Sequence, residues 1–273
     1  MRLVTFHDSS HREKIGLHFG AMGTGEIVDV KEAAAALSLP IRHLDEMLEA
    51  IRFEDETIPV LREICDAKKA GKVPPVAVLR ESEVLLLAPI PKPVSMRDGY
   101  AFRQHVAAAR RNRGVEMIPE FDLFPVYYFT NHMAVVGPGD LKVRELFLEK
   151  LDFELEVAVV IGRTGRNIRA EDADEHVFGY MIMNDWSARW LQMEEMKLNL
   201  GPAKGKDFAT GLGPYLVTRD ELEAARAVSP QGERYNLGMK CFVNGKQVSS
   251  GNVNEMTWTF AQLLERVSYG VTL

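Results

Sequence analysis

The alternation of apolar and polar residues predicts short strands followed by helices in the first ninety residues. The strands are expected at residues 3–6, 14–19 and 26–29. Helical spacing and good helix formers follow at residues 30–37, 42–51 and 57–70. Asp29 is placed to cap the first of these helices, and Gly71 with two nearby prolines ends the last. This pattern predicts a small α/β module.

After this module the pattern changes to many short strands and few helices. A strand at 84–88 leads into Pro89-Ile90-Pro91-Lys92-Pro93, whose prolines favour an extended linker, so we place a domain boundary between residues 89 and 90. Further strands are expected at residues 124–129, 134–136, 151–161, 176–183, 214–217, 238–243 and 246–249. Helices are expected at 100–112 and 256–267, and Asn244-Gly245 is a strong hairpin signal. The expected fold is α+β and mainly β, with the module at 1–89 and a mixed β domain at 90–273.

Composition narrows the class of protein. The 273 residues are 46% hydrophobic and 26% charged, as in an ordinary globular protein that buries a core. The net charge of −6 argues against a nucleic acid or an anionic membrane as partner, and the basic run Arg110–Arg113 is interpreted as an exposed helix end. Two cysteines define neither a disulfide framework nor a zinc site. Without a signal peptide or a membrane-spanning stretch, we expect a cytoplasmic protein.

Two acids stand at the start of the predicted strand at 151–161. Glu154 and Glu156 are two residues apart, so they are expected on one face of the strand. At ~4 Å two such charges repel by roughly 4 kcal/mol at an effective dielectric of about 20. A bound cation would reverse this repulsion, and ligation by oxygen alone favours a hard ion such as Mg²⁺, Mn²⁺ or Ca²⁺. The alternative is a strand with a hydrated acidic edge.

Other candidate residues also lie beside predicted turns. Asp98 and His105 flank a strand-to-helix turn, where Asp98 is either a ligand or a helix cap and His105 is either a base or a solvated side chain. Asp185 follows an apolar strand and precedes a predicted helix, so it is again either a ligand or a cap. Lys206 lies in a glycine-rich segment without the spacing of a phosphate-binding loop, and taken alone it would be interpreted as a surface lysine.

From about Ile90 to its end, the chain resembles the fumarylacetoacetate hydrolase family in its motifs and in their order along the sequence. The motifs that carry the resemblance are Met183–Arg189 with Gln192, Gly201-Pro202, Gly205–Phe208, Phe153–Ala158 and Val136–Asp140. The resemblance implies a mixed β-sandwich or barrel-like roll with the site at its mouth. It also implies a homodimer and a divalent cofactor, Mg²⁺ or Ca²⁺, with Mn²⁺ as a further option.

The resemblance also assigns roles to residues of this chain. The metal site would comprise Asp98, Glu154, Glu156, Asp185, Lys206 and Thr210. Tyr100, Gln192 and Tyr128 would hold the substrate, His105 would be the base, and Lys206 would stabilise developing negative charge.

Some positions depart from the family pattern. Ala108 stands where many smaller relatives carry the acid of a His-x-x-Glu dyad, which favours the fumarylacetoacetase branch. Met196 replaces an expected substrate-holding tyrosine, and an expected arginine falls near Gly114, beside Arg113. The family continues beyond the position of Leu273, so a molecule ending there is expected to have an open barrel and poor activity.

The expected function is cleavage of a carbon–carbon bond in a 1,3-diketo acid of the fumarylacetoacetate or acylpyruvate type. In this hypothesis His105 activates water, the metal holds the enolate and Lys206 stabilises the oxyanion. Two alternatives remain open. One is decarboxylation of a β-keto acid such as oxaloacetate, or isomerisation or hydration of a dienoic keto acid, on the same scaffold. The other is a relative that binds a keto acid without turnover.

Overall fold

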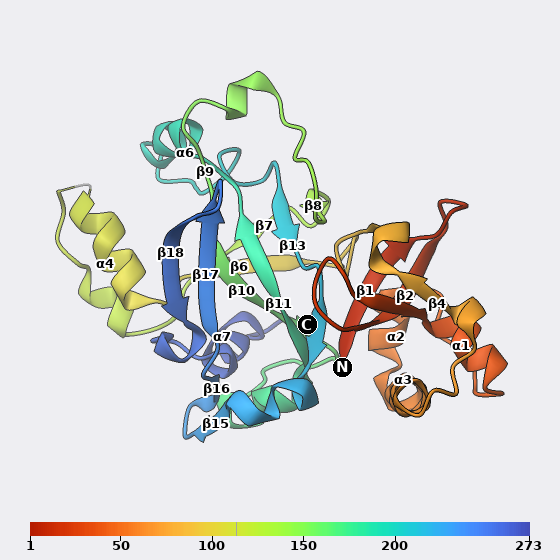
Figure 1. Cartoon of the computed structure of the whole chain (residues 1–273). Coiled ribbons are helices and arrows are strands. Elements are labelled where there is room, and N and C mark those ends of the chain that lie inside the picture. The colour runs from red at the N-terminus through yellow and green to blue at the C-terminus, as the bar shows by residue number, and fades with distance from the viewer. Residues whose placement is uncertain (113) are drawn as a thin grey trace.

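One twisted sheet joins the N-terminal module to later strands in the computed structural model, which describes residues 1–112 and 114–273 (Figure 1). In this described part, the sheet order is β4 (Val78–Arg80), β3 (Glu26–Asp29), β2 (Glu13–Phe19), β1 (Arg2–His7), β14 (Leu216–Thr218), β11 (Val177–Asp185), β13 (Thr210–Leu212) and β8 (Val135–Val136). β10 (Leu155–Ile161) also pairs with β11, and β5 (Leu85–Leu86) with β1. The β13–β8 pair is parallel and the other pairs are antiparallel, so the sheet is mixed and curls into a half-barrel.

The remaining strands form two-stranded ribbons around this sheet. They are β6 (Met96–Gly99) with β7 (Tyr127–Thr130), β9 (Leu151–Asp152) with β12 (Ser187–Ala188), β15 (Arg226–Ser229) with β16 (Gly232–Tyr235), and β17 (Gly238–Val243) with β18 (Lys246–Asn252). The hairpin predicted at Asn244-Gly245 joins β17 to β18, and both residues have the positive φ of a type I′ turn.

Helices are few, as the pattern predicted. They are α1 (Val30–Ala36), α2 (Met47–Arg52), α3 (Glu54–Lys69), α4 (Arg103–Asn112), α5 (Ala170–Ala173), α6 (Arg189–Met196) and α7 (Phe260–Val267). Short 3₁₀ turns occur at Pro75–Ala77, Glu81–Glu83, Pro119–Asp122, Glu145–Phe147, Asp174–His176, Arg219–Ala225 and Val253–Glu255. Asp29 caps α1 as predicted, since its carboxylate accepts a hydrogen bond from Glu32 N at 3.1 Å. The prediction of a mainly β, α+β chain is therefore confirmed.

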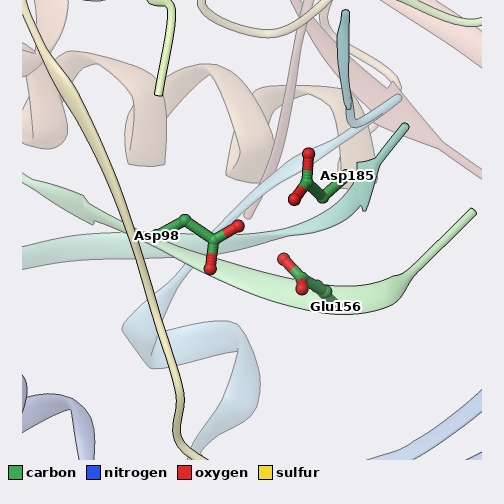
Figure 2. A group of neighbouring side chains, drawn as sticks. All are labelled: Asp98, Glu156 and Asp185. Carbon is green, nitrogen blue, oxygen red and sulfur yellow. The ribbon is translucent and has the colours of Figure 1, made fainter. Parts of the chain in front are cut away.

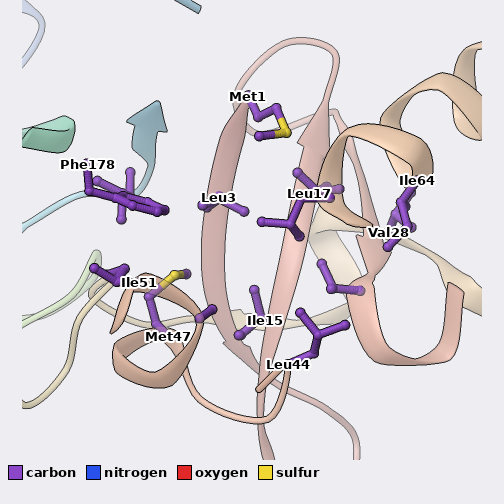
Figure 3. Packing of buried hydrophobic residues seen from close by; sticks show 14 of the residues in the cluster. Met1, Leu3, Ile15, Leu17, Val28, Leu44, Met47, Ile51, Ile64 and Phe178 are labelled. Atoms are coloured by element: carbon purple, nitrogen blue, oxygen red, sulfur yellow. The ribbon is translucent and has the colours of Figure 1, made fainter. Parts of the chain in front are cut away.

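The N-terminal module shares its core with the rest of the chain. β1 pairs with β14, with Leu3 opposite Leu216. Leu3, Met47 and Phe178 belong to one buried cluster, in which Phe178 of β11 lies beside the side chains of the module (Figure 3). The proline segment is also held in place, because Thr5 Oγ1 donates to Pro89 O at 2.6 Å. The boundary between residues 89 and 90 remains a prediction, and both sheet and core cross it.

The structure corrects three local expectations. The strand predicted at 151–161 is interrupted, so Glu154 lies in the gap between β9 and β10. Asp185 is the last residue of β11 rather than a helix cap, because β12 intervenes before α6 begins at Arg189. Asp98 lies within strand β6 and does not cap α4, which begins at Arg103.

The described part of the basic run predicted as an exposed helix end lies at the end of α4. Arg111 there is exposed, whereas Arg113 lies outside the described residues. None of the helices in the described part has the length and apolar character needed to cross a bilayer.

Candidate metal centre

Three carboxylates from different strands converge beside the sheet. Asp98 comes from β6, Glu156 from β10 and Asp185 from the end of β11, and each offers an oxygen within 4.8 Å of the others. Glu156 lies opposite Met183 in the β10–β11 register, so Asp185, two residues further on, projects from the same face of the sheet. Figure 2 shows the three carboxylate groups pointing toward one another. Segments distant in sequence therefore form one acidic cluster.

Burial makes these carboxylates costly to ionise. It raises the pKa of Asp98 to about 7, and the charge of Asp185 adds to this effect. Burial, followed by the charge of Asp98, also raises the pKa of Glu156 well above its usual range. Asp185 Oδ1 is buried without a hydrogen-bond partner, and within the described residues neither Asp98 nor Glu156 forms an ion pair. Three converging carboxylates, two of them without an ion-pair partner in the described chain and the third with one oxygen free, fit a hard divalent ion.

Lys206 lies at the border of this cluster. Its ammonium contacts Asp185 Oδ2 and lies 2.8 Å from Glu154 Oε2, and the residue is only 4% exposed. The interpretation as a surface lysine is therefore wrong. Burial lowers the pKa of Lys206, but the charges of Asp185 and Glu154 outweigh burial and raise it. The side chain consequently remains a charged donor and does not act as a base near neutral pH.

Glu154 is placed differently from the other three predicted carboxylate ligands. Besides Lys206, it binds Arg189, whose Nη2 lies 2.8 Å from Glu154 Oε1. Its backbone N donates to Asn184 Oδ1 at 3.1 Å. Two cations thus compensate Glu154, and it stays outside the group of three, so its role as a ligand remains a prediction.

Tyr128 contacts carboxylates of the cluster directly. Its hydroxyl group lies 3.1 Å from Asp98 Oδ2 and 2.7 Å from Asp185 Oδ2. Burial and these two charges raise the pKa of Tyr128, so it remains a neutral hydrogen-bond donor. Thr210, assigned near an ion by the resemblance, is buried on β13 directly opposite Asp185.

The other predicted residues lie outside this cluster. Tyr100 and His105 are exposed, and the imidazole of His105 makes no hydrogen bond or ion pair with the described residues. The helix that carries His105, α4, projects away from the strands at the left of Figure 1. Gln192 accepts a hydrogen bond from Arg189 Nη1 at 3.0 Å. The roles assigned to these three side chains remain predictions.

Arg189 is the main residue to which sequence reasoning gave no role. It also binds Asp152, with 2.8 Å between Arg189 Nε and Asp152 Oδ2, and so links β9, Glu154 and Gln192. Its place in the Met183–Arg189 motif was visible in the sequence, but its carboxylate partners Asp152 and Glu154 lie more than thirty residues earlier.

Comparisons with known proteins agree with this architecture. A family model described as "Fumarylacetoacetate (FAA) hydrolase C-terminal" matches residues 95–273. The oxaloacetate tautomerase YisK of Bacillus subtilis (strain 168) is 32% identical over 254 residues, covering 91% of this chain and 78% of that protein. The solved structure of a fumarylacetoacetate hydrolase (EaFAH) from psychrophilic Exiguobacterium antarcticum is 28% identical with a TM-score of 0.68, covering 100% of this chain and 83% of that one.

A second solved structure shows the same fold. It is maleylpyruvate hydrolase from Sphingobium sp. SYK-6 in complex with manganese(II) ion and pyruvate, 22% identical with a TM-score of 0.67, covering 100% of this chain and 84% of that one. The family model covers well over half of the residues, and the curled mixed sheet agrees with the solved structures. This chain therefore belongs to the fumarylacetoacetate hydrolase family.

Proposed function

We propose that this protein is a divalent-metal-dependent enzyme that interconverts the keto and enol forms of a small dicarboxylic 2-oxo acid of the oxaloacetate type. The observation that carries the proposal is the convergence of Asp98, Glu156 and Asp185 beside the charged amine of Lys206. The similarity to YisK, named an oxaloacetate tautomerase, supports this choice of substrate.

The acidic residues of the cluster and the lysine beside it would have different roles. Asp98, Glu156 and Asp185 would hold Mg²⁺, Mn²⁺ or Ca²⁺, and the bound ion would supply Lewis acidity toward the oxygens of the substrate. Lys206, held between Asp185 and Glu154, would direct its ammonium group at the negative charge that develops on an enolate oxygen. Tyr128 would hold Asp98 and Asp185 through its hydroxyl group.

Keto–enol exchange suits the described geometry better than hydrolysis does. Exchange takes a proton from carbon and returns one to oxygen, and solvent can carry this proton, whereas hydrolysis also needs a base placed to activate an attacking water. His105, the base assigned by resemblance, is exposed and makes no contact with the acidic cluster. The predicted homodimer and cytoplasmic location remain proposals.

The test is a substrate panel with controlled metal content. We expect the full chain to accelerate decay of the enol form of oxaloacetate with Mg²⁺ or Mn²⁺, and to lose this activity in EDTA. Glu156→Gln and Asp185→Asn should lose both bound metal and turnover, measured by elemental analysis and by enol absorbance. Glu194→Gln is the control, because Glu194 is exposed and pairs with Lys197 on the surface. A metal-loaded protein without tautomerase activity would contradict the proposal.

Hydrolysis of a 1,3-diketo acid is the second candidate. The similarity to EaFAH and the Asp98-to-His105 segment favour it. In this case His105→Ala should lower acylpyruvate hydrolysis by roughly 10²–10⁴-fold while bound metal is retained. Under the tautomerase proposal the same variant keeps its oxaloacetate activity. Assaying both substrates with this variant separates the two reactions.

A further inference from the structure

The segment that carries Lys206 is held by a carboxylate of α6. Glu195 Oε1 accepts a hydrogen bond from Lys204 N at 2.9 Å, and Glu195 Oε2 accepts one from Gly205 N at 3.0 Å. Both oxygens of one side chain are thus used to fix two consecutive peptide groups, directly before Lys206. We propose that Glu195 is a positioning residue that presents Lys206 to the acidic cluster.

The contact between this segment and α6 is close. A Cβ at Gly205 would lie 2.6 Å from Gln192 N, so the backbone of the segment lies directly against the helix. Gly205 O also accepts a hydrogen bond from Ala188 N at 2.8 Å. Asn131 Nδ2 holds the far side by donating to Asp207 O at 3.0 Å. The backbone at Lys206 is therefore fixed on both sides.

Two lysines that are two residues apart in this segment differ in exposure, one being buried and the other exposed to solvent. The side chain of Lys206 is 4% exposed, whereas that of Lys204 is 58% exposed and pairs with Asp207. Ordering a long lysine side chain costs conformational entropy. A backbone that is already fixed leaves only this side chain to be ordered, which makes Glu195 important for the position of the amine.

Helix α6 then positions both members of one ion pair. Arg189, its first residue, binds Glu154, and Glu195, one residue before its end, fixes the backbone next to Lys206. Lys206 and Glu154 meet at 2.8 Å. A shift of the C-terminal end of α6 would thus move the amine away from Glu154 and Asp185.

Chemical labelling tests the position of the amine without requiring any activity. The full chain is treated with an acetyl N-hydroxysuccinimide ester, and acetylation of Lys206 and Lys204 is measured by mass spectrometry. We expect Lys206 to react at least tenfold more slowly than Lys204 in the parent protein. Glu195→Ala should raise the Lys206 rate at least fivefold, Glu195→Gln should raise it less, and Glu194→Gln should leave it unchanged.

A folded Glu195→Ala protein with an unchanged Lys206 rate would overturn the inference. Circular dichroism establishes folding, and if Glu195→Ala does not fold, Glu195→Gln decides by the same criterion. An equal rise in Glu194→Gln would also contradict it, because the effect would then not be specific to Glu195.

The activity arm rests on the proposed function and uses a double-mutant cycle. Glu195→Ala should lower kcat for oxaloacetate tautomerisation with little change in KM, and it should have no further effect in a Lys206→Met background. Independent losses in the two backgrounds would contradict action through Lys206. If the parent protein lacks tautomerase activity, the proposed function fails, while the labelling result still decides the role of Glu195.

Discussion

At the scale of residues, the centre combines acids that resist ionisation with one amine that stays charged. Burial raises the pKa of Asp98 and Glu156, while neighbouring carboxylates raise that of Lys206 despite its burial. A bound divalent ion would therefore offset the free-energy cost of ionising these buried carboxyl groups, which the folded protein bears without it. This arrangement links metal affinity, pH and stability.

Replacement of Asp98 tests this link. The folded protein binds the Asp98 proton more tightly than the unfolded chain, so its destabilising effect is absent near pH 4, grows as pH rises and is complete above about pH 7. In EDTA, Asp98→Asn should melt several degrees above the parent at pH 8 and by a clearly smaller margin at pH 5, because each kcal/mol of stability shifts the melting temperature by about 2–4 °C. Excess Mn²⁺ should reverse the order at pH 8.

Thermal melting from pH 5 to pH 8, with EDTA or with MnCl₂, measures this effect. Glu194→Gln serves as the matched acid-to-amide control on the surface. A melting difference between Asp98→Asn and the parent that does not vary with pH would show that the Asp98 carboxyl ionises as freely as one in water.

Local sequence signals identified the acids but not all of their partners. Asp98, Glu156 and Asp185 were identified from their places beside turns and strand ends together with the family resemblance, and the structure brings them together. The pairing of Glu154 with Arg189 could not be predicted, because it depends on an interruption between β9 and β10. The burial of Lys206 depends on how α6 packs, which local pattern does not encode.

At the scale of elements, long periodic segments were predictable and short pairings were not. The sequence pattern predicted β2 and β11 within two residues of their observed bounds, whereas β10 begins four residues after the predicted start. β12 was missed because two residues, Ser187 and Ala188, become a strand only by pairing with β9. This omission explains why a helix cap was left open as an alternative for Asp185, two residues earlier.

The close approach of the Lys206 segment to α6 predicts that Gly205 tolerates no side chain. Gly205→Ala should destabilise the protein by about 1–3 kcal/mol, because the added methyl group would meet the backbone of Gln192. Urea unfolding measures the change. Gly238→Ala is the control, since nothing lies within 4 Å of a Cβ there, and its effect should stay within about 0.5 kcal/mol. Equal stability of the two variants would contradict this packing.

At the scale of the whole molecule, the N-terminal module and the remaining chain share one sheet and one core. β1 is hydrogen-bonded to β14, and Phe178 packs in the same cluster as Leu3 (Figure 3). The prolines at 89–93 suggested a domain boundary because they indicate a stiff, extended segment. Local composition does not indicate which surfaces on the two sides of that segment pack together. Continuity of this kind predicts cooperative unfolding.

Two optical probes test cooperativity across residues 89 and 90. The three tryptophans, at positions 186, 190 and 258, all follow the boundary, whereas α1–α3 precede it and contribute to far-UV circular dichroism. We expect both signals to change at the same urea concentration. Leu216→Ala should shift both together, at a cost of about 2–5 kcal/mol, because Leu216 is fully buried opposite Leu3. Separate transitions would show independent domains.

The pairing of β1 with β14 also has a consequence for biosynthesis. Leu3 leaves the ribosome more than 200 residues before its partner Leu216. At about 5–20 residues per second, that edge of β1 waits roughly 10–40 s for its neighbour. An unpaired edge invites pairing with other nascent chains. Slow translation or a crowded polysome should therefore lower the yield of native protein, and chaperones that shield strand edges should restore it.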